Sequence, residues 1–350
     1  MKKIAEDICE ILHDYHAEHD FKFTANHVIN WVNQFDPTDR EFILTEFLHL
    51  LNHGIYIDKN KGRRLLLSCI KGLASQFKFD EISEFLKHAD FLSLQPSGKS
   101  QSILLEMVDD ILIKNYGVEI AKCGSKSKKY AIYIDDILAT GNSARKYLKD
   151  WLVLKNSFGG KNIDDVINGT KILIVSVFCL HTWPDIGMRL KRELDRSGIE
   201  NKIKYRYHYL IENHPTKPNQ RFNFTYPVKN QPKEVLEFLD GLKDKSPWPM
   251  TKKEYAFRNS ERPEPESLFS SAANRVRFEN ILVKKGVEIL NGATKLNDNQ
   301  RPLGNINPSF QTLGTGTLFF TWANVSNTSP VVFWWGFNNW QYLFPIVNRG

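Results

Sequence analysis

The chain has 350 residues, a length that fits one large domain or two domains of ordinary size. Hydrophobic residues make up 41% of it and aromatic residues 12%, so it can bury a substantial core, which excludes wholesale disorder. The formal net charge of +7 is modest for this length and suggests phosphate-bearing ligands or weak contact with nucleic acid.

Cysteine usage and the N-terminal segment indicate the compartment. Cys9, Cys69, Cys123 and Cys179 are far apart and form no metal-binding pattern, as expected in a reducing environment. Acidic residues interrupt the apolar positions of the N-terminal segment, so it does not resemble a signal peptide. No apolar run approaches the length of a membrane span. We therefore expect a cytoplasmic protein without membrane contact.

Residues 1–90 are predicted to form a helical region. Apolar residues recur at helical spacing, and Asp36-Pro37-Thr38-Asp39 is a typical start signal before one of these runs. The helical runs cover residues 4–12, 28–32, 42–51, 65–77 and 82–86. Such a region in front of a catalytic core would act as a cap or as a docking surface for a partner.

A strand, a loop and a helix are predicted next. Phe91 to Leu94 favours a strand, Gln95 to Ser100 a loop, and Ile103 to Ile113 a helix. The loop contains Gly98-Lys99-Ser100, which also occurs in the phosphate-binding loop of nucleoside triphosphatases. That motif requires a glycine five positions before Gly98, where this sequence has Ser93, so the pattern does not support a triphosphatase.

A second strand, loop and helix follow at residues 130–148, which read YAIYIDDILATGNSARKYL. Ala131 to Ile134 is a short apolar run typical of a buried strand, and Asp135 and Asp136 stand where we expect the strand to end. Small and hydrogen-bonding residues then lead into a helical pattern. Loop amides and a helix N-terminus together form a site for an anion, and Gly141 allows close approach of the backbone.

The two aspartates narrow the choice of ligand. A carboxylate beside a phosphate is repulsive unless it faces another part of the same molecule. A sugar phosphate satisfies both groups, because Asp135 and Asp136 can accept hydrogen bonds from ribose hydroxyls while the loop binds the 5′-phosphate. The segment IYIDDILATGNSA resembles the phosphoribosyl-pyrophosphate loop of type I phosphoribosyltransferases. Asn142 stands where many members of that family carry a second glycine. A strand and turn with an exposed acidic pair is the structural alternative.

The resemblance implies a set of site residues. It assigns the catalytic residues Asp135, Asp136 and Lys99, with both aspartates holding the ribose. The residues that it implies for 5′-phosphate binding are Ala139, Thr140, Gly141, Asn142 and Ser143. Gly98, Lys99 and Ser100 then belong to the loop that binds pyrophosphate, for which an ordinary capped turn is the alternative. The resemblance also implies Mg²⁺ as cofactor, held mainly by the oxygens of phosphoribosyl pyrophosphate and not directly by protein ligands.

The middle of the chain alternates strands and helices, which predicts a parallel sheet flanked by helices. Residues 171–180 form the most strand-like run and should be a central strand, whereas 203–211 alternates as an outer strand does. A helix is expected over 184–194. His181 lies just past the central strand and either approaches the site or is structural.

The remaining chain reads as a loop or lid from residue 213 to 232, a short helix over 235–242, an irregular segment over 246–266, and a helix over 278–290 that stops at Asn291-Gly292. The tail is aromatic-rich and is predicted to form two β runs around a polar turn. Its aromatic residues either pack in a core or provide a wall on which a base stacks.

The tail carries a second resemblance. Its pattern is similar to that of phosphoribosyltransferase-like proteins of bacterial anti-phage conflict systems, some of which are encoded beside retron reverse transcriptases. Trp322-Ala323 stands where we expect an arginine before Asn324 in relatives. The pattern comprises Arg277-Phe278-Glu279, Pro302-Leu303-Gly304, Gly314-Thr315-Gly316-Thr317, Asn324, Pro330, Trp334, Trp340 and Leu343-Phe344-Pro345.

The predicted fold class is α/β, a type I phosphoribosyltransferase-like parallel sheet flanked by helices, with an N-terminal helical region and a C-terminal aromatic-rich β extension. We expect the domains 1–90 (helical), 91–212 (core) and 213–350 (lid and extension).

The expected function is that of an effector in anti-phage defence, which binds phosphoribosyl pyrophosphate or a nucleotide and acts at ribose C1. A reverse transcriptase with its RNA–DNA product, or another defence protein, is the expected partner. An inactive ligand-binding regulator and a salvage phosphoribosyltransferase are the alternatives.

Overall fold

The computed structural model divides the chain into two compact units by its contacts. The first unit comprises residues 1–58 and 211–350, and the second comprises residues 59–210. Residues 1–58 of the predicted helical region therefore lie in the first unit, and residues 59–90 lie in the second. The structure describes residues 1–17, 21–154, 161–182, 202–213, 221–245, 249–294, 296–336 and 339–346.

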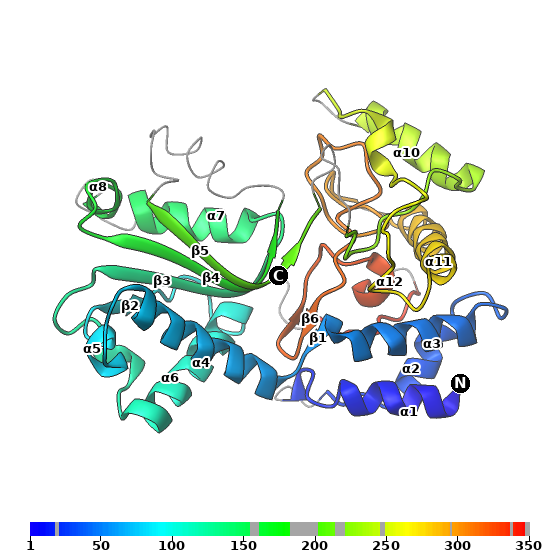
Figure 1. The fold of residues 1–350 in the computed structure, drawn as a ribbon. Coiled ribbons are helices and arrows are strands. Elements are labelled where there is room, and N and C mark those ends of the chain that lie inside the picture. The colour runs from blue at the N-terminus through cyan, green and yellow to red at the C-terminus, as the bar shows by residue number, and fades with distance from the viewer. Residues whose placement is uncertain are drawn as a thin grey trace. The chain divides into compact units, whose positions relative to one another are not determined.

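A four-stranded parallel sheet is the centre of the second unit (Figure 1). Its strands follow one another in chain order: β2 (Ala89–Phe91), β3 (Tyr130–Leu138), β4 (Ile172–His181) and β5 (Ile203–Ile211). β3 and β4 occupy the interior positions, and their side chains are buried almost throughout. The two strands are apolar on both faces because helices cover both, as is usual in parallel sheets. The predicted α/β class is confirmed.

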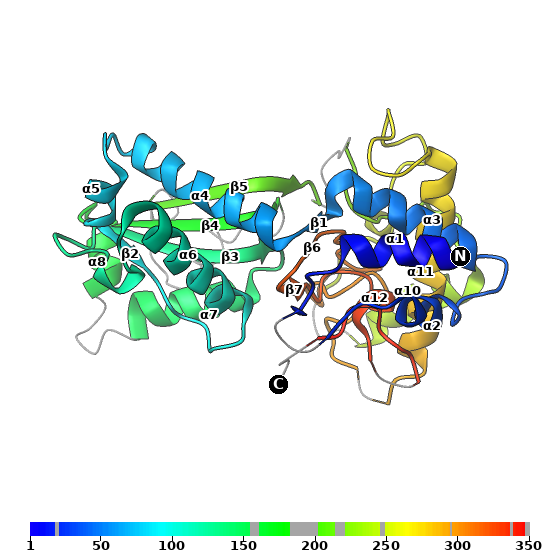
Figure 2. The ribbon, with the colours of Figure 1, turned by 90° about the horizontal axis from the view of Figure 1, so that it is seen from below.

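Helices cover the two faces of this sheet. α4 (Lys59–Gln76) and α6 (Ser100–Tyr116) lie on one face, whereas α7 (Asn142–Lys149) and α8 (Lys161–Ile167) lie on the other (Figures 1 and 2). The short helix α5 (Ile82–Leu86) leads into β2. Gly117 follows α6 in the left-handed conformation, which is a common way for a helix to end.

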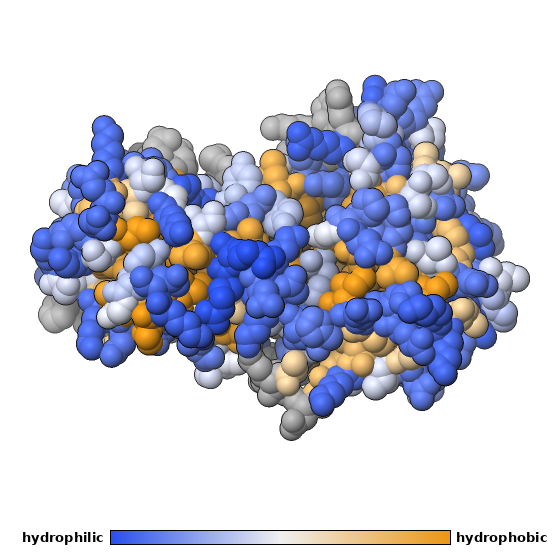
Figure 3. Space-filling view, turned by 60° about the horizontal axis from the view of Figure 1, so that its bottom comes forward, coloured by the Kyte–Doolittle hydropathy of each residue, from blue (hydrophilic) through white to orange (hydrophobic). Residues whose placement is uncertain are grey.

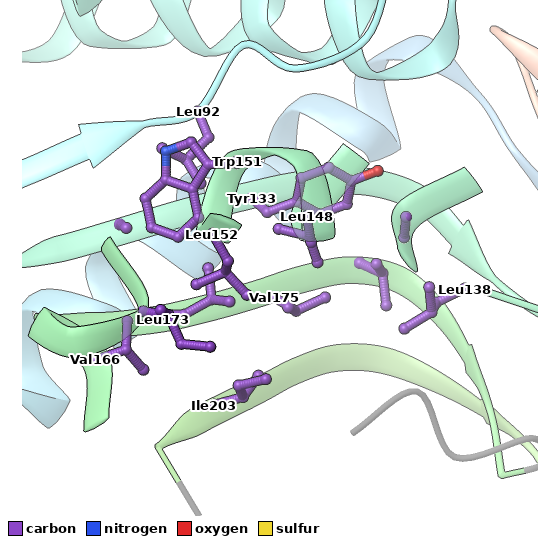
Figure 4. Close-up of a cluster of buried hydrophobic side chains, with 14 residues drawn as sticks. Leu92, Tyr133, Leu138, Leu148, Trp151, Leu152, Val166, Leu173, Val175 and Ile203 are labelled. Carbon is purple, nitrogen blue, oxygen red and sulfur yellow. The ribbon is translucent and has the colours of Figure 1, made fainter. Parts of the chain in front are cut away.

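A hydrophobic cluster joins the α7 side of the sheet to its helices (Figure 4). Leu148 and Trp151 come from α7 and the turn after it, and Val166 comes from α8. They pack on Tyr133 of β3 and Val175 of β4. This packing fixes the position of α7, and therefore of the loop between β3 and α7.

Two strand boundaries differ from the sequence prediction. β2 covers Ala89–Phe91 and not residues 91–94, although the amide of Leu92 still donates to the carbonyl of Ile132. β3 continues to Leu138, so Asp135 and Asp136 lie inside the strand and not after it. Continued pairing with β4 explains the extension, since Asp135 pairs with Val177 and Leu138 with Leu180.

The first unit combines helices from both ends of the chain. Residues 51–55 form a π-helical turn after α3, and α12 replaces the second predicted β run of the tail. Pro330 precedes α12, and the fixed backbone of proline favours the start of a helix. The helices are α1 (Lys2–Ile11), α2 (Ala25–Val32), α3 (Arg40–Leu50), α10 (Lys233–Lys245), α11 (Ala272–Asn291) and α12 (Val331–Trp334).

A small sheet in the same unit pairs β1 (Tyr56–Ile57) in parallel with β6 (Phe320–Thr321), which pairs antiparallel with β7 (Asn324–Val325). β1 was not predicted, because two residues are too short to show alternation. The predicted β extension of the tail is present in β6 and β7. The helix expected over 184–194 lies outside the described residues.

Aromatic rings hold the N-terminal helices against the tail. Phe333 stacks on Trp31 with ring centroids 5.8 Å apart, and on Phe47 at 5.3 Å. Phe320 and Phe344 stack at 4.8 Å. The tail tryptophans Trp322, Trp334, Trp335 and Trp340 are all buried, so of the two predicted roles the aromatic residues of the tail serve packing.

Among the described residues, no helix is both long enough and apolar enough to cross a membrane. Figure 3 shows one face of the molecule, where hydrophilic side chains predominate and hydrophobic ones are exposed only in patches between them.

Neighbouring residues of α6 provide a test of this core. Leu112 is fully buried, whereas Ile113 is 46% exposed. We expect Leu112→Ala to lower the free energy of unfolding by about 2–5 kcal/mol, because it leaves a cavity. Ile113→Ala, the matched control, should lower it by less than about 1 kcal/mol. Urea unfolding followed by circular dichroism measures both values, and equal losses would contradict the assigned orientation of α6.

Candidate functional site

Two loops follow neighbouring parallel strands, at the carboxyl ends where α/β sheets bind ligands. The first loop joins β2 to α6 and comprises residues 92–99. The second loop joins β3 to α7 and comprises residues 139–141. The sequence-predicted site residues lie in these loops, in the first turns of α6 and α7, and in β3.

The first loop contains the predicted pyrophosphate-binding residues. Gly98 has a φ of 81°, a left-handed conformation that favours glycine. Lys99 is the N-cap residue of α6 in extended conformation, and Ser100 is the first residue of that helix. The loop thus delivers Lys99 and Ser100 to a helix N-terminus, where backbone amides and the helix dipole favour an anion.

A buried glutamine fixes this loop. The Oε1 atom of Gln101 accepts hydrogen bonds from the amides of Leu94 and Gln95, both at 2.8 Å. Its Nε2 atom donates to the carbonyl of Ile134 in β3 at 3.2 Å. The side chain of Gln101 is fully buried, so it replaces water as the partner of these backbone groups.

Asp135 joins the first loop to β3. Its Oδ1 atom accepts a hydrogen bond from the hydroxyl of Ser100 at 2.7 Å and one from the amide of Asp136 at 3.0 Å. Its Oδ2 atom accepts from Nε2 of Gln95 and from the hydroxyl of Tyr133, both at 2.8 Å. A carboxylate has about four acceptor sites, so these four donors occupy the group. The structure therefore brings Ser100 and Asp135, two predicted site residues, into direct contact.

Asp136 follows Asp135 in the same strand and is also buried. Because side chains alternate along a strand, the two carboxylates start from opposite faces of β3. The Oδ1 atom of Asp136 accepts a hydrogen bond from the amide of Ile137 at 2.8 Å. Burial, with the charge of Asp136 as a further cause, raises the pKa of the Cys179 thiol in β4.

The second loop contains the residues predicted to bind phosphate. Ala139 and Thr140 follow β3, and Gly141, with a φ of 69°, is the N-cap residue of α7. Asn142 and Ser143 are exposed and form the first turn of α7, whose first amides have no partner within the helix. Packing of Ala144 and Leu148 in the hydrophobic cluster holds this turn in place.

His181 is the last residue of β4 and is buried. It directly follows Leu180, the partner of Leu138 at the end of β3, so it lies at the edge of the sheet where the loops are. Burial lowers the pKa of His181 to about 3. The imidazole is therefore neutral at physiological pH, and it would have to act as a neutral donor or acceptor.

Several residues of this site were not predicted from the sequence. Gln95, Gln101 and Tyr133 surround Asp135 or fix its loop, yet the sequence assigned a role to none of them. One signal was available for Tyr133, which stands two residues before Asp135 and must share its face of the strand. Gln95 and Gln101 carry no such signal, because amide side chains occur in most loops.

Several residues of the tail pattern occupy packing positions. A Cβ atom on Gly316 would lie 1.9 Å from the carbonyl oxygen of Thr225, and one on Gly304 would lie 2.2 Å from that of Thr328. Both glycines have positive φ, so only glycine fits there. The indole of Trp334 donates to the carbonyl of Ser329, at 2.8 Å. These residues build the first unit and contact its own backbone.

A buried ion-pair network in the first unit was also missed. Glu279 accepts from Arg258 at 2.9 Å and from Arg275 at 3.2 Å. Arg275 also pairs with Glu266 at 2.5 Å and donates to the carbonyls of Phe222 and Phe224. Two glutamates thus neutralise two arginines inside the unit, which makes the network a structural clamp.

The parallel sheet with these two loops defines a protein of the phosphoribosyltransferase type. A model of the PRTase-CE family, where PRTase abbreviates phosphoribosyltransferase, matches residues 28–345. The chain belongs to this family. No curated protein and no solved structure matches it.

The role of Gln101 can be tested with a matched pair of variants. We expect Gln101→Leu to lower the free energy of unfolding by about 1–3 kcal/mol, because two loop amides and one carbonyl lose their partner. Gln76→Leu, at an exposed position of α4, should change it by less than about 0.5 kcal/mol. Hydrogen exchange should quicken at the Leu94 and Gln95 amides in Gln101→Leu only. Unchanged exchange there would refute the assigned role.

Proposed function

We propose that the protein binds phosphoribosyl pyrophosphate at the two loops and catalyses substitution at ribose C1. The observation that carries the proposal is the contact between Ser100 and Asp135, which joins the loop after β2 to the strand that leads into the loop after β3. Phosphoribosyl pyrophosphate has a phosphate at one end, a pyrophosphate at the other and a ribose diol between them. These three parts match the loop after β3, the loop after β2 and the two aspartates of β3. Membership of the PRTase-CE family supports the same activity.

In this proposal the second loop binds the 5′-phosphate. Amides of residues 139–143 and the hydroxyls of Thr140 and Ser143 donate to its oxygens, and the left-handed Gly141 lets the backbone approach closely. Binding energy from this remote phosphate orients the sugar for reaction.

Asp136 and Asp135 hold the ribose in the proposed complex. Each hydroxyl of the diol donates to a carboxylate, and the two negative charges stabilise the positive charge that develops on the ring. Asp135 already has four donors, so a ribose hydroxyl binds it only by replacing Ser100 or Gln95. Binding of the sugar would therefore loosen the first loop from β3 while the pyrophosphate arrives there.

Lys99 and the amides of Gly98 and Ser100 bind the pyrophosphate in this scheme. The described residues contain no group of three or more His, Cys, Asp or Glu side chains that could hold a metal ion. In this proposal a Mg²⁺ ion arrives with the ligand and is coordinated mainly by pyrophosphate oxygens and water. Such an ion supplies charge neutralisation of the leaving group.

The reaction breaks the bond between C1 and the pyrophosphate oxygen, and pyrophosphate leaves with the electron pair. A nucleophile then forms a bond to C1 and passes its proton to the departing pyrophosphate or to water: the nitrogen of a base in a transfer, or the oxygen of water in a cleavage. Residues 98–100 stabilise the departing anion, and the carboxylates stabilise the ring.

We further propose that this activity serves as the effector of a bacterial anti-phage system of the retron type. The tail pattern, which includes Gly304, Gly314 and Gly316, supports this role through its resemblance to proteins of such systems. A reverse transcriptase with its RNA–DNA product, or another defence protein, would then hold the effector inactive in healthy cells.

One observation favours a second candidate, a regulator that binds the ligand without turnover. The four donors around Asp135 satisfy this carboxylate inside the protein, as in a structural role. A regulator would retain ligand binding but release no pyrophosphate.

Binding and turnover can be separated with two variants. Thr140→Trp should weaken binding of phosphoribosyl pyrophosphate with Mg²⁺ by roughly 100-fold or more, because the indole fills the phosphate loop. Thr170→Trp, at an exposed turn, should bind as the wild type does. Asp136→Asn should keep binding within about tenfold but reduce pyrophosphate release by roughly 10²–10³-fold.

Calorimetry measures the binding, and a coupled pyrophosphate assay measures the release. Wild-type binding without any release, with bases or water as acceptor, would favour the regulator. The absence of wild-type binding would refute both candidates.

A further inference from the structure

The first unit contains a cavity, whereas the two loops belong to the second unit. The helices α10 and α11 pack side by side (Figures 1 and 2). Residues of α10 and of the segment that follows α11 form the cavity. Its volume is about 620 Å³, which lies in the range of small-molecule sites. Phe238 and Leu242 of α10, with Pro308, provide apolar walls.

Arg301 lines this cavity and is only 3% exposed. Its Nη1 atom donates to the carbonyls of Asp298 at 2.7 Å and Gln300 at 2.8 Å. Its Nε atom is buried and has no hydrogen-bond partner. Among the described residues, no carboxylate forms an ion pair with the guanidinium, although the charge of Asp298 is near enough to act on it.

Two other arginines of this unit are also buried, but unlike Arg301 they have carboxylate partners. Arg258 and Arg275 are similarly buried, and each forms an ion pair with the fully buried Glu279. A buried charge without such a partner is unfavourable unless something else pairs with it. Burial lowers the pKa of Arg301 to about 10, so the side chain still carries its charge at neutral pH.

The geometry of Arg301 defines what can pair with it. Because both bonds to the loop carbonyls come from Nη1, the edge of the guanidinium with Nε and Nη2 makes no hydrogen bond with the described residues, and a partner reaches the buried Nε only when neighbouring atoms move. This edge is one of the forks that bind both oxygens of a carboxylate or a phosphate. The two carbonyls hold the fork in a fixed orientation.

The rim of the cavity is acidic. Glu234 and Glu237 on α10 and Asp298 in the segment after α11 line it, and all three are exposed, with Glu237 paired to Lys233 at 3.2 Å. A doubly charged phosphate would be repelled by these carboxylates. A singly charged carboxylate whose molecule also carries a cationic group satisfies both the arginine and the rim.

We propose that this cavity binds a small zwitterion of the α-amino acid class, with its carboxylate on Arg301. The ammonium group then lies toward the carboxylates of Glu234, Glu237 or Asp298, and an apolar side chain packs on Phe238 and Leu242. Such a site would make the protein responsive to a metabolite that is not its substrate. The site lies within one unit and does not depend on the proposed reaction.

The test measures binding to the full chain. The melting temperature is recorded with each of the twenty amino acids and with inorganic phosphate, and calorimetry follows for those that stabilise. We expect at least one amino acid with an apolar side chain to bind, and Arg301→Lys to weaken it about 10–100-fold, since a charged bidentate contact is lost. Arg221→Lys, at an exposed position of the same unit, is the control and should not change it.

A second comparison keeps the test decisive if Arg301→Lys fails to fold. The exposed pair Glu234→Gln/Glu237→Gln should weaken leucine several-fold but leave 4-methylpentanoate, which lacks the ammonium group, unchanged or tighter. Absence of binding by every amino acid, or equal binding in Arg301→Lys, would overturn the site. Stronger stabilisation by phosphate than by any amino acid would overturn the proposed ligand class.

Discussion

The carboxylate of Asp135 is the group on which the candidate site depends. It lies inside β3, where an isolated charge would be unfavourable, and four donors compensate for its burial. Two of these donors, Gln95 and Ser100, come from the segment after β2. The buried charge of Asp135 thus orders the first loop against β3 before any ligand binds. The order of the first loop therefore depends on the same contacts of Ser100 and Gln95 that a ribose hydroxyl would replace at Asp135.

The local parts of this site could be predicted from the sequence. The order of apolar strand, acidic pair, small loop and helix at residues 130–148 depends only on neighbours in the chain, and the structure has that order. The end of β3 could not be predicted, because Asp135 stays in the strand through pairing with Val177 of β4. The donors of Asp135 also come from residues up to 40 positions away, as with Gln95.

In the first unit, contacts between distant parts of the chain were even harder to predict from the sequence. Its N-terminal helices were predicted from apolar spacing, but their partners lie at the other end of the chain. The indole of Trp31 donates to the carbonyl of Val332, and the hydroxyl of Tyr15 donates to that of Pro345. The tail glycines were recognised as a pattern, and only the structure shows that Gly316 is required by the close approach of Thr225.

The proposed site requires that the loop after β3 binds the 5′-phosphate of a phosphoribosyl ligand. A crystal structure of the full chain with phosphoribosyl pyrophosphate and MgCl₂ would show whether it does. We expect a phosphate at the amides of residues 139–143, a ribose diol at Asp135 and Asp136, and a longer distance between Ser100 and Asp135. A ligand bound elsewhere, with these residues unchanged at saturating concentration, would contradict it.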